Sequence, residues 1–447
     1  MKRLLSSVLV VIMILGFSAC GGTGSDQQQG GAEPKSATDQ TSTEGSANDR
    51  NVTIKFASVT NYGGFETVKQ LIQCYEELNP NIKVELNELP PTSSSTEVHQ
   101  TLVTSLASGA DTFDVLTADC IWFPEFAEAG WLLELDKYIS QDDLKDYFKG
   151  AIDTVTYKGQ LIGMPWAIDS GLLYYRKDLL DKYGYQPPKT WDELVSQTKD
   201  ILAKENNPEL KGYIWQAKQA EVLVCNLVEF LGGKGKVLDD NGNIFINDEN
   251  GKRAAQKMYD LIYKDKISPE TVITYDEEPS RTVFSSGNAI FHRNWPYAWS
   301  ICQDEKESKV VGNVGIAPLP EFEGAGSAAC LGGYQFAANK ATKYPDESAD
   351  FVKFLSGAET QKLFTLTQNS SPTRQEIYKD PEVLQKNPLL PSLQSVFVNA
   401  APRPITPYYP QMSLVLQTEF SKLLSNKQDV NTTVENCAEQ IQALYKK

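Results

Sequence analysis

The sequence is poor in histidine, cysteine and clustered basic residues. Its 447 residues include two histidines, His99 and His292, and seven cysteines without CxxC pairs or zinc-ribbon spacing. We therefore expect no metal site and no cofactor, and we interpret both histidines as ordinary core or surface residues. The 42 Lys and Arg against 58 Asp and Glu give a formal charge of -16 without a basic block. This argues against a nucleic-acid partner, because phosphate binding needs clustered basic residues.

The chain also lacks the short motifs of several enzyme classes. GxSxG, HExxH, a Walker phosphate loop and GxGxxG are all absent. A glycoside hydrolase stays open as an alternative, because such an enzyme needs only two carboxylates. No internal repeat of twenty to fifty residues indicates a solenoid, and the length suffices for two substantial cores.

The first fifty residues divide into an export signal and a polar tether. Residues 1–19 have a basic start, a short apolar run and small residues before Cys20, which is typical of a signal peptide. Cys20 in this setting resembles the acylated cysteine of a bacterial lipobox, and an ordinary secretory signal is the alternative. Residues 21–50 contain no large apolar residue, so 20–50 is predicted to be a lipidated cysteine followed by a disordered tether. We expect an exported protein anchored to the outer face of the cytoplasmic membrane, the periplasmic side in a diderm host.

The start of the remaining body alternates predicted strands and helices. Val52, Ile54 and Phe56 alternate with polar residues, and helical spacing follows until Asn79-Pro80. The pattern β-α-β-α-β predicts a parallel sheet with ligands beyond the carboxyl ends of its strands, where Asp119 and Trp122 lie. The predicted strands are 52–56, 82–89 and 113–116, and the predicted helices are 65–78 and 97–108.

Three further local patterns have structural interpretations. Thr190 and Glu193 form a predicted capping box. Residues 238–246 favour a hairpin over a calcium loop, because the EF-hand positions for Gly and Glu are occupied by Ile244 and Asn250. Six cysteines remain after Cys20, for which we expect between zero and two disulfides.

Seven segments rich in aromatic residues, glycine and proline stand out along the body. They are 117–126, 129–132, 163–166, 169–179, 293–299, 331–334 and 402–410. In this order they resemble the ligand loops of bacterial extracellular sugar-binding proteins. Together they are similar to the trehalose/maltose-binding branch of the family 1 solute-binding proteins.

The resemblance implies an α/β fold with two lobes of the maltose-binding-protein type (type II), joined by three hinge crossings. We expect the N-terminal lobe to comprise 51–164 plus 331–372 and the C-terminal lobe 165–330 plus 373–447. It also implies a non-catalytic, monomeric substrate-binding subunit that delivers a small α-glucoside to the permease of an ABC importer.

The residue chemistry fits a sugar site. Asp119 and Asp169 can accept hydrogen bonds from hydroxyls, Arg403 can donate a planar fork, and Gly333 lets backbone approach closely. An aromatic platform suits the apolar face of a sugar. The candidate platforms are Trp122, Trp166, Trp295, Tyr297 and Tyr334, and Glu66 is a weak substitute for a carboxylate that relatives carry nearby. Helix capping by Asp119, core packing of the tryptophans and bracing of a hinge loop by Arg403 are the structural alternatives.

Four positions depart from the resemblance. Relatives tend to carry an aromatic residue at Ala167, an Arg at Val98, a Trp at Tyr334 and a carboxylate near Gly64. The pocket therefore differs in volume and polarity, and trehalose, maltose, sucrose and glucosylglycerol all stay open as ligands.

Other functions stay open at this point. An exported glycoside hydrolase would use Asp119 and Asp169. A binding protein for peptides, polyamines or metals, and a sugar sensor that docks a membrane receptor, are further alternatives.

Overall fold

The computed structural model describes residues 51–59, 64–90, 95–109, 112–239, 242–368, 370–398 and 400–446. The predicted signal peptide, Cys20 and the tether lie outside these residues. The described residues belong to the unit Asn48–Lys447, which contains two large hydrophobic cores.

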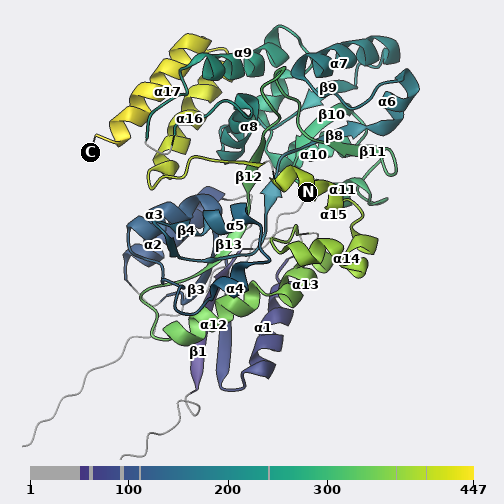
Figure 1. Cartoon of the computed structure of the whole chain (residues 1–447). Coiled ribbons are helices and arrows are strands. Elements are labelled where there is room, and N and C mark those ends of the chain that lie inside the picture. The colour runs from purple at the N-terminus through teal and green to yellow at the C-terminus, as the bar shows by residue number, and fades with distance from the viewer. Residues whose placement is uncertain are drawn as a thin grey trace, which may run out of the picture. The chain divides into compact units, whose positions relative to one another are not determined.

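The first core surrounds a five-stranded sheet (Figure 1) in the order β2-β1-β3-β13-β6. β1 pairs in parallel with β2 and with β3, which confirms the parallel unit predicted from the sequence. β13 and β6 then add antiparallel to β3 and to β13. The strands are β1 (Val52–Ser58), β2 (Ile82–Glu88), β3 (Val115–Asp119), β6 (Met164–Pro165) and β13 (Tyr334–Ala338).

Helices of this core form where apolar residues recur at helical spacing. α1 buries Val68, Leu71, Ile72 and Tyr75 and ends at Leu78, before Pro80. These four residues share one face of the helix, and this face is buried in the first core. The helices are α1 (Glu66–Leu78), α2 (Ser95–Ala107), α12 (Pro345–Leu355) and α13 (Ala358–Gln368).

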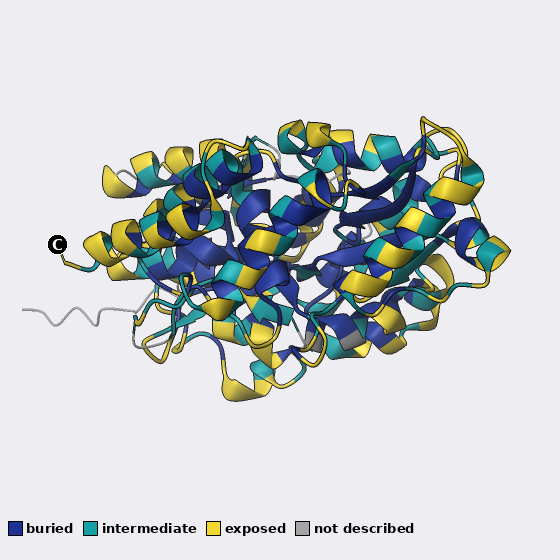
Figure 2. Ribbon diagram, turned by 90° about the horizontal axis from the view of Figure 1, so that it is seen from above, coloured by how far each residue is buried: buried dark blue, intermediate teal, exposed yellow. Residues whose placement is uncertain are grey.

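The second core surrounds a four-stranded mixed sheet in the order β11-β8-β10-β9. Figure 2 shows that its strands are buried, while the helices around them turn exposed residues outward. The strands are β8 (Leu172–Arg176), β9 (Lys211–Ile214), β10 (Ala289–Asn294) and β11 (Val314–Ala317). The main helices are α6 (Lys177–Tyr183), α7 (Trp191–Glu205), α8 (Glu221–Leu231), α9 (Glu249–Tyr263), α10 (Glu277–Ser285), α16 (Tyr409–Leu424) and α17 (Val430–Leu444).

A three-stranded sheet, which we call the hinge sheet, lies where the chain passes between the cores (Figure 1). It consists of β14 (Ala400–Pro402), β12 (Ala329–Gly332) and β7 (Asp169–Ser170), in that order. β6 leads into β7, and β12 leads into β13. A third segment of the chain lies beside these two connections, where Ala167 and Pro372 form an isolated antiparallel β-bridge. The exact limits of the two lobes stay a prediction.

Shorter elements complete the described chain. They are η3 (Cys120–Trp122), α3 (Phe123–Glu128), α4 (Gln141–Leu144), α5 (Lys149–Thr154), β4 (Thr156–Tyr157), β5 (Gln160–Leu161), η4 (Glu270–Thr274), α11 (Ala298–Cys302), η5 (Gln375–Lys379), α14 (Pro381–Lys386) and α15 (Leu390–Val398).

The Thr190 half of the predicted capping box is confirmed, because the Thr190 hydroxyl accepts from the Glu193 N-H at the start of α7. The Glu193 carboxylate accepts from the Lys189 N-H, one residue before the N-cap N-H that a capping box requires. Leu238 and Ile244 pair as an antiparallel bridge, as a hairpin requires. The six cysteines of the described chain are free thiols, at the lower end of the expected range.

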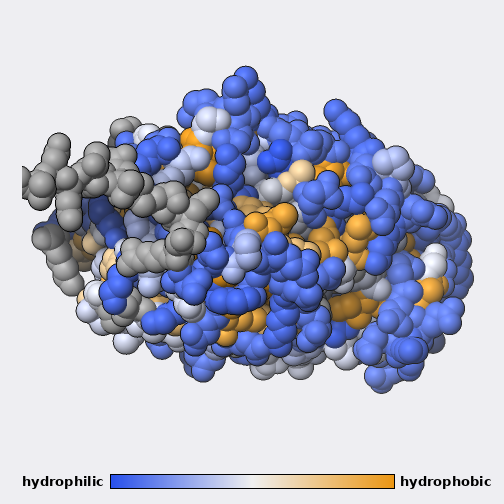
Figure 3. Space-filling view, turned by 90° about the horizontal axis from the view of Figure 1, so that it is seen from below, coloured by the Kyte–Doolittle hydropathy of each residue, from blue (hydrophilic) through white to orange (hydrophobic). Residues whose placement is uncertain are grey.

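The surface is mostly polar. Figure 3 shows one largely hydrophilic face with apolar residues gathered toward its middle. Within the described ranges, the large apolar side chains left exposed are Leu78, Ile405, Tyr408 and Leu414. No helix of the described chain is both long and apolar enough to span a membrane.

Candidate functional site

A cavity of about 350 Å³ lies between residues of the two cores. Its volume falls at the small end of the range typical of small-molecule sites. It is lined by Ser95, Thr96, Glu97, Asp119, Ala167, Asp169, Lys218, Ala220, Glu221, Val222, Cys225, Asp276, Glu277, Trp295, Gly332, Gly333, Tyr334 and Arg403.

The hinge sheet supplies part of this lining. Asp169 in β7 pairs with Gly332 at the end of β12, and Arg403 directly follows β14. Gly333 has a φ of +129° and an added Cβ would lie 2.1 Å from the Ala167 carbonyl oxygen. Only glycine fits there, which accounts for the close backbone approach expected of this residue.

Asp119 enters the cavity from the first core. It ends β3, where it lies opposite Tyr334 of β13. Its Oδ1 accepts from the Ile121 N-H at 3.2 Å and from Arg403 Nη2 at 3.0 Å. The cap and the ion pair therefore coexist, and they share one oxygen of the carboxylate.

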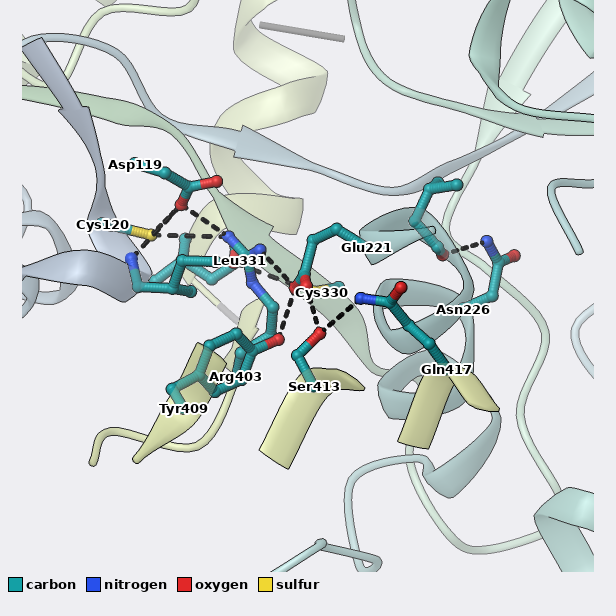
Figure 4. A network of polar contacts seen from close by, with 12 residues as sticks. Asp119, Cys120, Glu221, Asn226, Cys330, Leu331, Arg403, Tyr409, Ser413 and Gln417 are labelled. Atoms are coloured by element: carbon teal, nitrogen blue, oxygen red, sulfur yellow. Dashed lines mark hydrogen bonds and ion pairs between the residues drawn. The ribbon is translucent and has the colours of Figure 1, made fainter. Parts of the chain in front are cut away.

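Helix α8 of the second core carries two carboxylates on one stripe, of which Glu221 lines the cavity. Glu221, Cys225 and Glu229 follow one another at intervals of four residues, so they share a helix face. Glu221 accepts from Arg403 (Figure 4), and Glu229 accepts from Arg293. Each carboxylate therefore has a buried arginine as partner, which offsets the cost of burying its charge.

Trp295 provides an aromatic surface in the cavity. It follows β10 and is partly buried. The Arg293 guanidinium lies 3.9 Å from the indole centroid, and the indole N-H donates to Glu277 Oε1 at 3.3 Å. These two contacts fix the ring in a defined orientation, as a sugar platform requires.

The cavity is strongly acidic. Lys218 pairs with Asp276 at 2.6 Å, but the side-chain carboxylate of Asp169 makes no hydrogen bond within the described chain. Burial raises the pKa of Asp169 to about 7, partly opposed by Arg293. Burial also raises the pKa of Glu277. A ligand rich in hydroxyl donors would satisfy these carboxylates. The lining carboxylates are Glu97, Asp119, Asp169, Glu221, Asp276 and Glu277, against Lys218 and Arg403.

Two of the predicted tryptophans lie in the first core and do not line the cavity. Trp122 is 3% exposed and packs against His99 and Tyr334. Trp166 is 1% exposed and stacks on Phe336. The packing alternative describes both residues in this structure.

Tyr297 and Glu66 also lie outside the cavity lining. The buried Tyr297 hydroxyl donates to Glu278 Oε1 at 2.7 Å. Glu66 begins α1, and its side chain is 88% exposed. Asp119, Asp169, Trp295, Gly333, Tyr334 and Arg403 are the predicted residues that the structure brings together.

The two histidines have structural surroundings. His292 is buried, and burial lowers its pKa to about 3, so it stays neutral. His99 is partly buried and lies 2.5 Å from the Glu125 carboxylate.

Two of the four positions that depart from the resemblance line the cavity, and two do not. Ala167 and Tyr334 line the cavity, whereas Val98 is fully buried in the first core and Gly64 is exposed. Ala167 and Tyr334 are therefore the departures that alter the cavity itself.

Sequence reasoning missed part of the lining. Glu221 carried a usable signal, because it begins an otherwise apolar helix that also contains Glu229. The run Asp276-Glu277-Glu278 was a second signal. Ser95, Thr96, Glu97 and Lys218 lie on no motif, and only the folded chain brings them to the cavity.

The family model of the bacterial extracellular solute-binding proteins matches residues 60–362. The chain belongs to this family. A probable ABC transporter-binding protein of Deinococcus radiodurans is 37% identical over 385 residues, which cover 84% of this chain and 90% of that protein. A maltotriose-binding protein of Pyrococcus abyssi is 25% identical, covering 71% of this chain and 66% of that protein.

Solved structures of similar proteins agree on the architecture. Maltose-bound MalE3 of T. maritima matches with a TM-score of 0.80 and 38% identity, covering 88% of this chain and all of that chain (100%). The GacH receptor of Streptomyces glaucescens matches with a TM-score of 0.75 and 24% identity, covering 89% and 99%. The likeness confirms the two-lobed α/β fold of the maltose-binding-protein type. As a bacterial extracellular solute-binding protein, the chain is not an enzyme, and the hydrolase interpretation of Asp119 and Asp169 is set aside.

Proposed function

We propose that this chain is the substrate-binding subunit of an ABC importer and that it captures a small α-glucoside between its two cores. The observation that carries the proposal is the cavity itself. It combines the Trp295 ring with the unpaired Asp169 carboxylate and with Asp119 of the other core. An apolar ring face and several acceptors are what a sugar, with its apolar C-H face and its hydroxyl edges, requires.

The position of the cavity supports a closure mechanism. A ligand that contacts both cores stabilises the closed arrangement more than the open one, so it shifts the population toward closure. A ligand held by one core alone would bind without closing the protein. The permease is then proposed to read the closed form.

Maltose is the first ligand to test, because the MalE3 structure of 38% identity is maltose-bound. Trehalose, sucrose and glucosylglycerol are the other candidates. Ala167, which stands where relatives carry an aromatic residue, leaves that part of the cavity without a ring. A compact ligand with one ring stacked on Trp295 fits this lining.

The experiment is a thermal-shift screen of the purified protein, followed by calorimetry. Because a ligand that binds only the folded state raises the melting temperature, one or two α-glucosides should shift the curve. The panel contains maltose, trehalose, sucrose, glucosylglycerol, longer maltodextrins, amino acids and polyamines. Asp169→Asn should lose the shift, whereas Thr190→Ala, far from the cavity, should keep it. Silence of every sugar together with a shift by a polyamine or an amino acid would refute the proposal.

We also propose export and lipid anchoring through Cys20. The basic start, the apolar run and the small residues before Cys20 support this. Metabolic labelling with a fatty-acid analogue should mark the wild-type protein but not Cys20→Ser, and Cys20→Ser should leave the membrane fraction. Equal labelling of both forms would contradict the anchor without affecting the sugar site.

A further inference from the structure

Glu221 is held by donors from two directions. It is the first residue of α8 and lines the cavity. Arg403 Nη1 donates to its Oε1 at 2.9 Å. The Tyr409 hydroxyl donates to the same oxygen, and the Ser413 hydroxyl donates to Oε2. Figure 4 shows these side chains converging on Glu221 from the segment after β14 and from α16.

Two side chains at the start of α16, Tyr409 and Ser413, hold the Glu221 carboxylate. Tyr409 and Ser413 are four residues apart and share a helix face. Ser413 in turn accepts from Gln417 at 2.8 Å. On the same helix, Met412, Leu416 and Phe420 are buried in the second core, whereas Tyr409 is buried in the first core. Glu221 therefore cannot change its orientation without losing two hydrogen bonds from α16 and one from Arg403.

Arg403 carries the connection onward to the first core. Its guanidinium is 3% exposed and holds one carboxylate on each terminal nitrogen, Glu221 on Nη1 and Asp119 on Nη2. The guanidinium is planar and rigid, so fixing one arm fixes the direction of the other. Burial strengthens both ion pairs relative to exposed ones. Asp119 ends β3 of the first core and Glu221 begins α8 of the second core. The two ion pairs of Arg403 therefore connect the cores.

Asp119 keeps an oxygen for the ligand. Its contacts to Ile121, Cys120 and Arg403 within the described chain all involve Oδ1. Oδ2 has no such contact, and the residue lines the cavity. The orientation of this free oxygen depends on Arg403, and the orientation of Arg403 depends on Glu221.

We infer that Glu221 is a positioning residue that holds Arg403 against Asp119, thereby tying the two cores together without ligand and aiming Asp119 Oδ2 at the ligand. The part that concerns the ligand rests on the proposed function. The part that concerns the two cores does not.

The first test measures the ligand-free protein. Spin labels are placed on the exposed Cys74 of α1 and on Glu439→Cys of α17, in a Cys20→Ser background. The other described cysteines are buried. Double electron-electron resonance then measures the distance between the two spin labels, which follows the distance between the cores. Glu221→Gln removes the charge at constant shape and should shift the distribution to longer distances.

The matched control is Glu419→Gln. Glu419 is a buried glutamate of α16 that, like Glu221, accepts from several donors, with Lys422, Gln428, Asn436 and Gln440 as partners and no place in the cavity lining. It should lower the melting temperature without changing the distance distribution. If Glu221→Gln does not fold, Ser413→Ala removes one neutral donor and should give a smaller shift in the same direction. Distances equal to those of the wild type in both Glu221→Gln and Ser413→Ala overturn the inference.

The second test is a double-mutant cycle on the Kd for the bound α-glucoside. Glu221→Gln should weaken binding about tenfold, because it acts through one charged contact. In an Arg403→Met background the same substitution should change the Kd less than twofold. Equal losses in both backgrounds mean that Glu221 does not act through Arg403, and they overturn the positioning role. A wild-type protein that binds no sugar refutes the proposed function instead, and the distance measurement still decides the tie between the cores.

Discussion

Ligand affinity should fall steeply as the pH drops below 7, because of Asp169. Burial in the cavity raises the pKa of this carboxyl from 3.8 to about 7, with Arg293 partly opposing the shift. Hydroxyl groups of a sugar donate to the ionised carboxylate, so binding favours the charged form and lowers this pKa. Protons and ligand therefore compete. The affinity is full above pH 7 and declines as the pH falls through the ligand-free pKa.

The size of the effect follows from the same shift. One pH unit below the ligand-free pKa, about nine in ten carboxyls are protonated, so the Kd should be about tenfold higher at pH 6 than at pH 8. The loss continues by about tenfold per pH unit until the pKa of the complex is reached. The free energy of unfolding also depends on this pKa, because the ligand-free fold holds the Asp169 proton more tightly than the unfolded chain does. The raised pKa lowers the stability of the ligand-free fold above pH 7, by at most about 4 kcal/mol.

Isothermal titration with the bound α-glucoside between pH 5 and pH 8.5 measures the profile. Asp169→Asn should bind weakly with a flatter profile, and its ligand-free form should melt higher than the wild type at pH 8 but not at pH 3.5. Glu277 lines the same cavity with a pKa that burial also raises, so Glu277→Gln separates its share. Glu419→Gln should keep the wild-type profile. Affinity that increases toward low pH would mean that the ligand accepts from a protonated Asp169, and the reasoning would fail.

Three further predictions concern single side chains. Trp295→Ala should raise the Kd at least tenfold with little change in melting temperature, whereas Trp122→Ala should cost about 3–5 kcal/mol of unfolding free energy as a core truncation. Calorimetry measures the Kd and denaturant unfolding measures the stability. The reversed pattern would mean that Trp122 is the platform and Trp295 the core residue. Gly333→Ala should lower the denaturant midpoint, since its Cβ would clash with backbone 2.1 Å away; an unchanged midpoint would contradict the glycine argument. Glu229→Gln should cost about 3–5 kcal/mol by leaving Arg293 buried without its counter-charge, and a loss below about 1 kcal/mol would show that the pair is not needed.

The sequence was sufficient for the regular elements of the first core. Alternating residues in β1 and helical spacing in α1 reflect burial of one face, and burial is a local property of the pattern. The antiparallel addition of β13 and β6 was not visible in the same way. These strands come from segments far along the chain, and their pairing depends on contacts that no local pattern records.

Part of the candidate site was predicted in two ways. Asp119 was predicted from its place at the end of a strand, whereas Asp169 and Arg403 were predicted from the resemblance to sugar-binding proteins; all three line the cavity. The tryptophans were harder, because an indole suits a core as well as a platform. Trp122 points into the first core and Trp295 lines the cavity, and that difference depends on tertiary packing.

The hinge sheet makes part of the cavity lining coincide with the pivot of the molecule. When two rigid bodies rotate about an axis, the displacement of any atom grows with its distance from that axis. Asp169 and Gly332 lie on the paired strands β7 and β12 of this sheet, so in the proposed closure their positions relative to the ligand change little. Glu97 and Lys218, contributed by elements away from those strands, travel farther. Under the proposed closure mechanism, contacts near the hinge sheet select the ligand before closure, and contacts remote from it form only once closure has occurred.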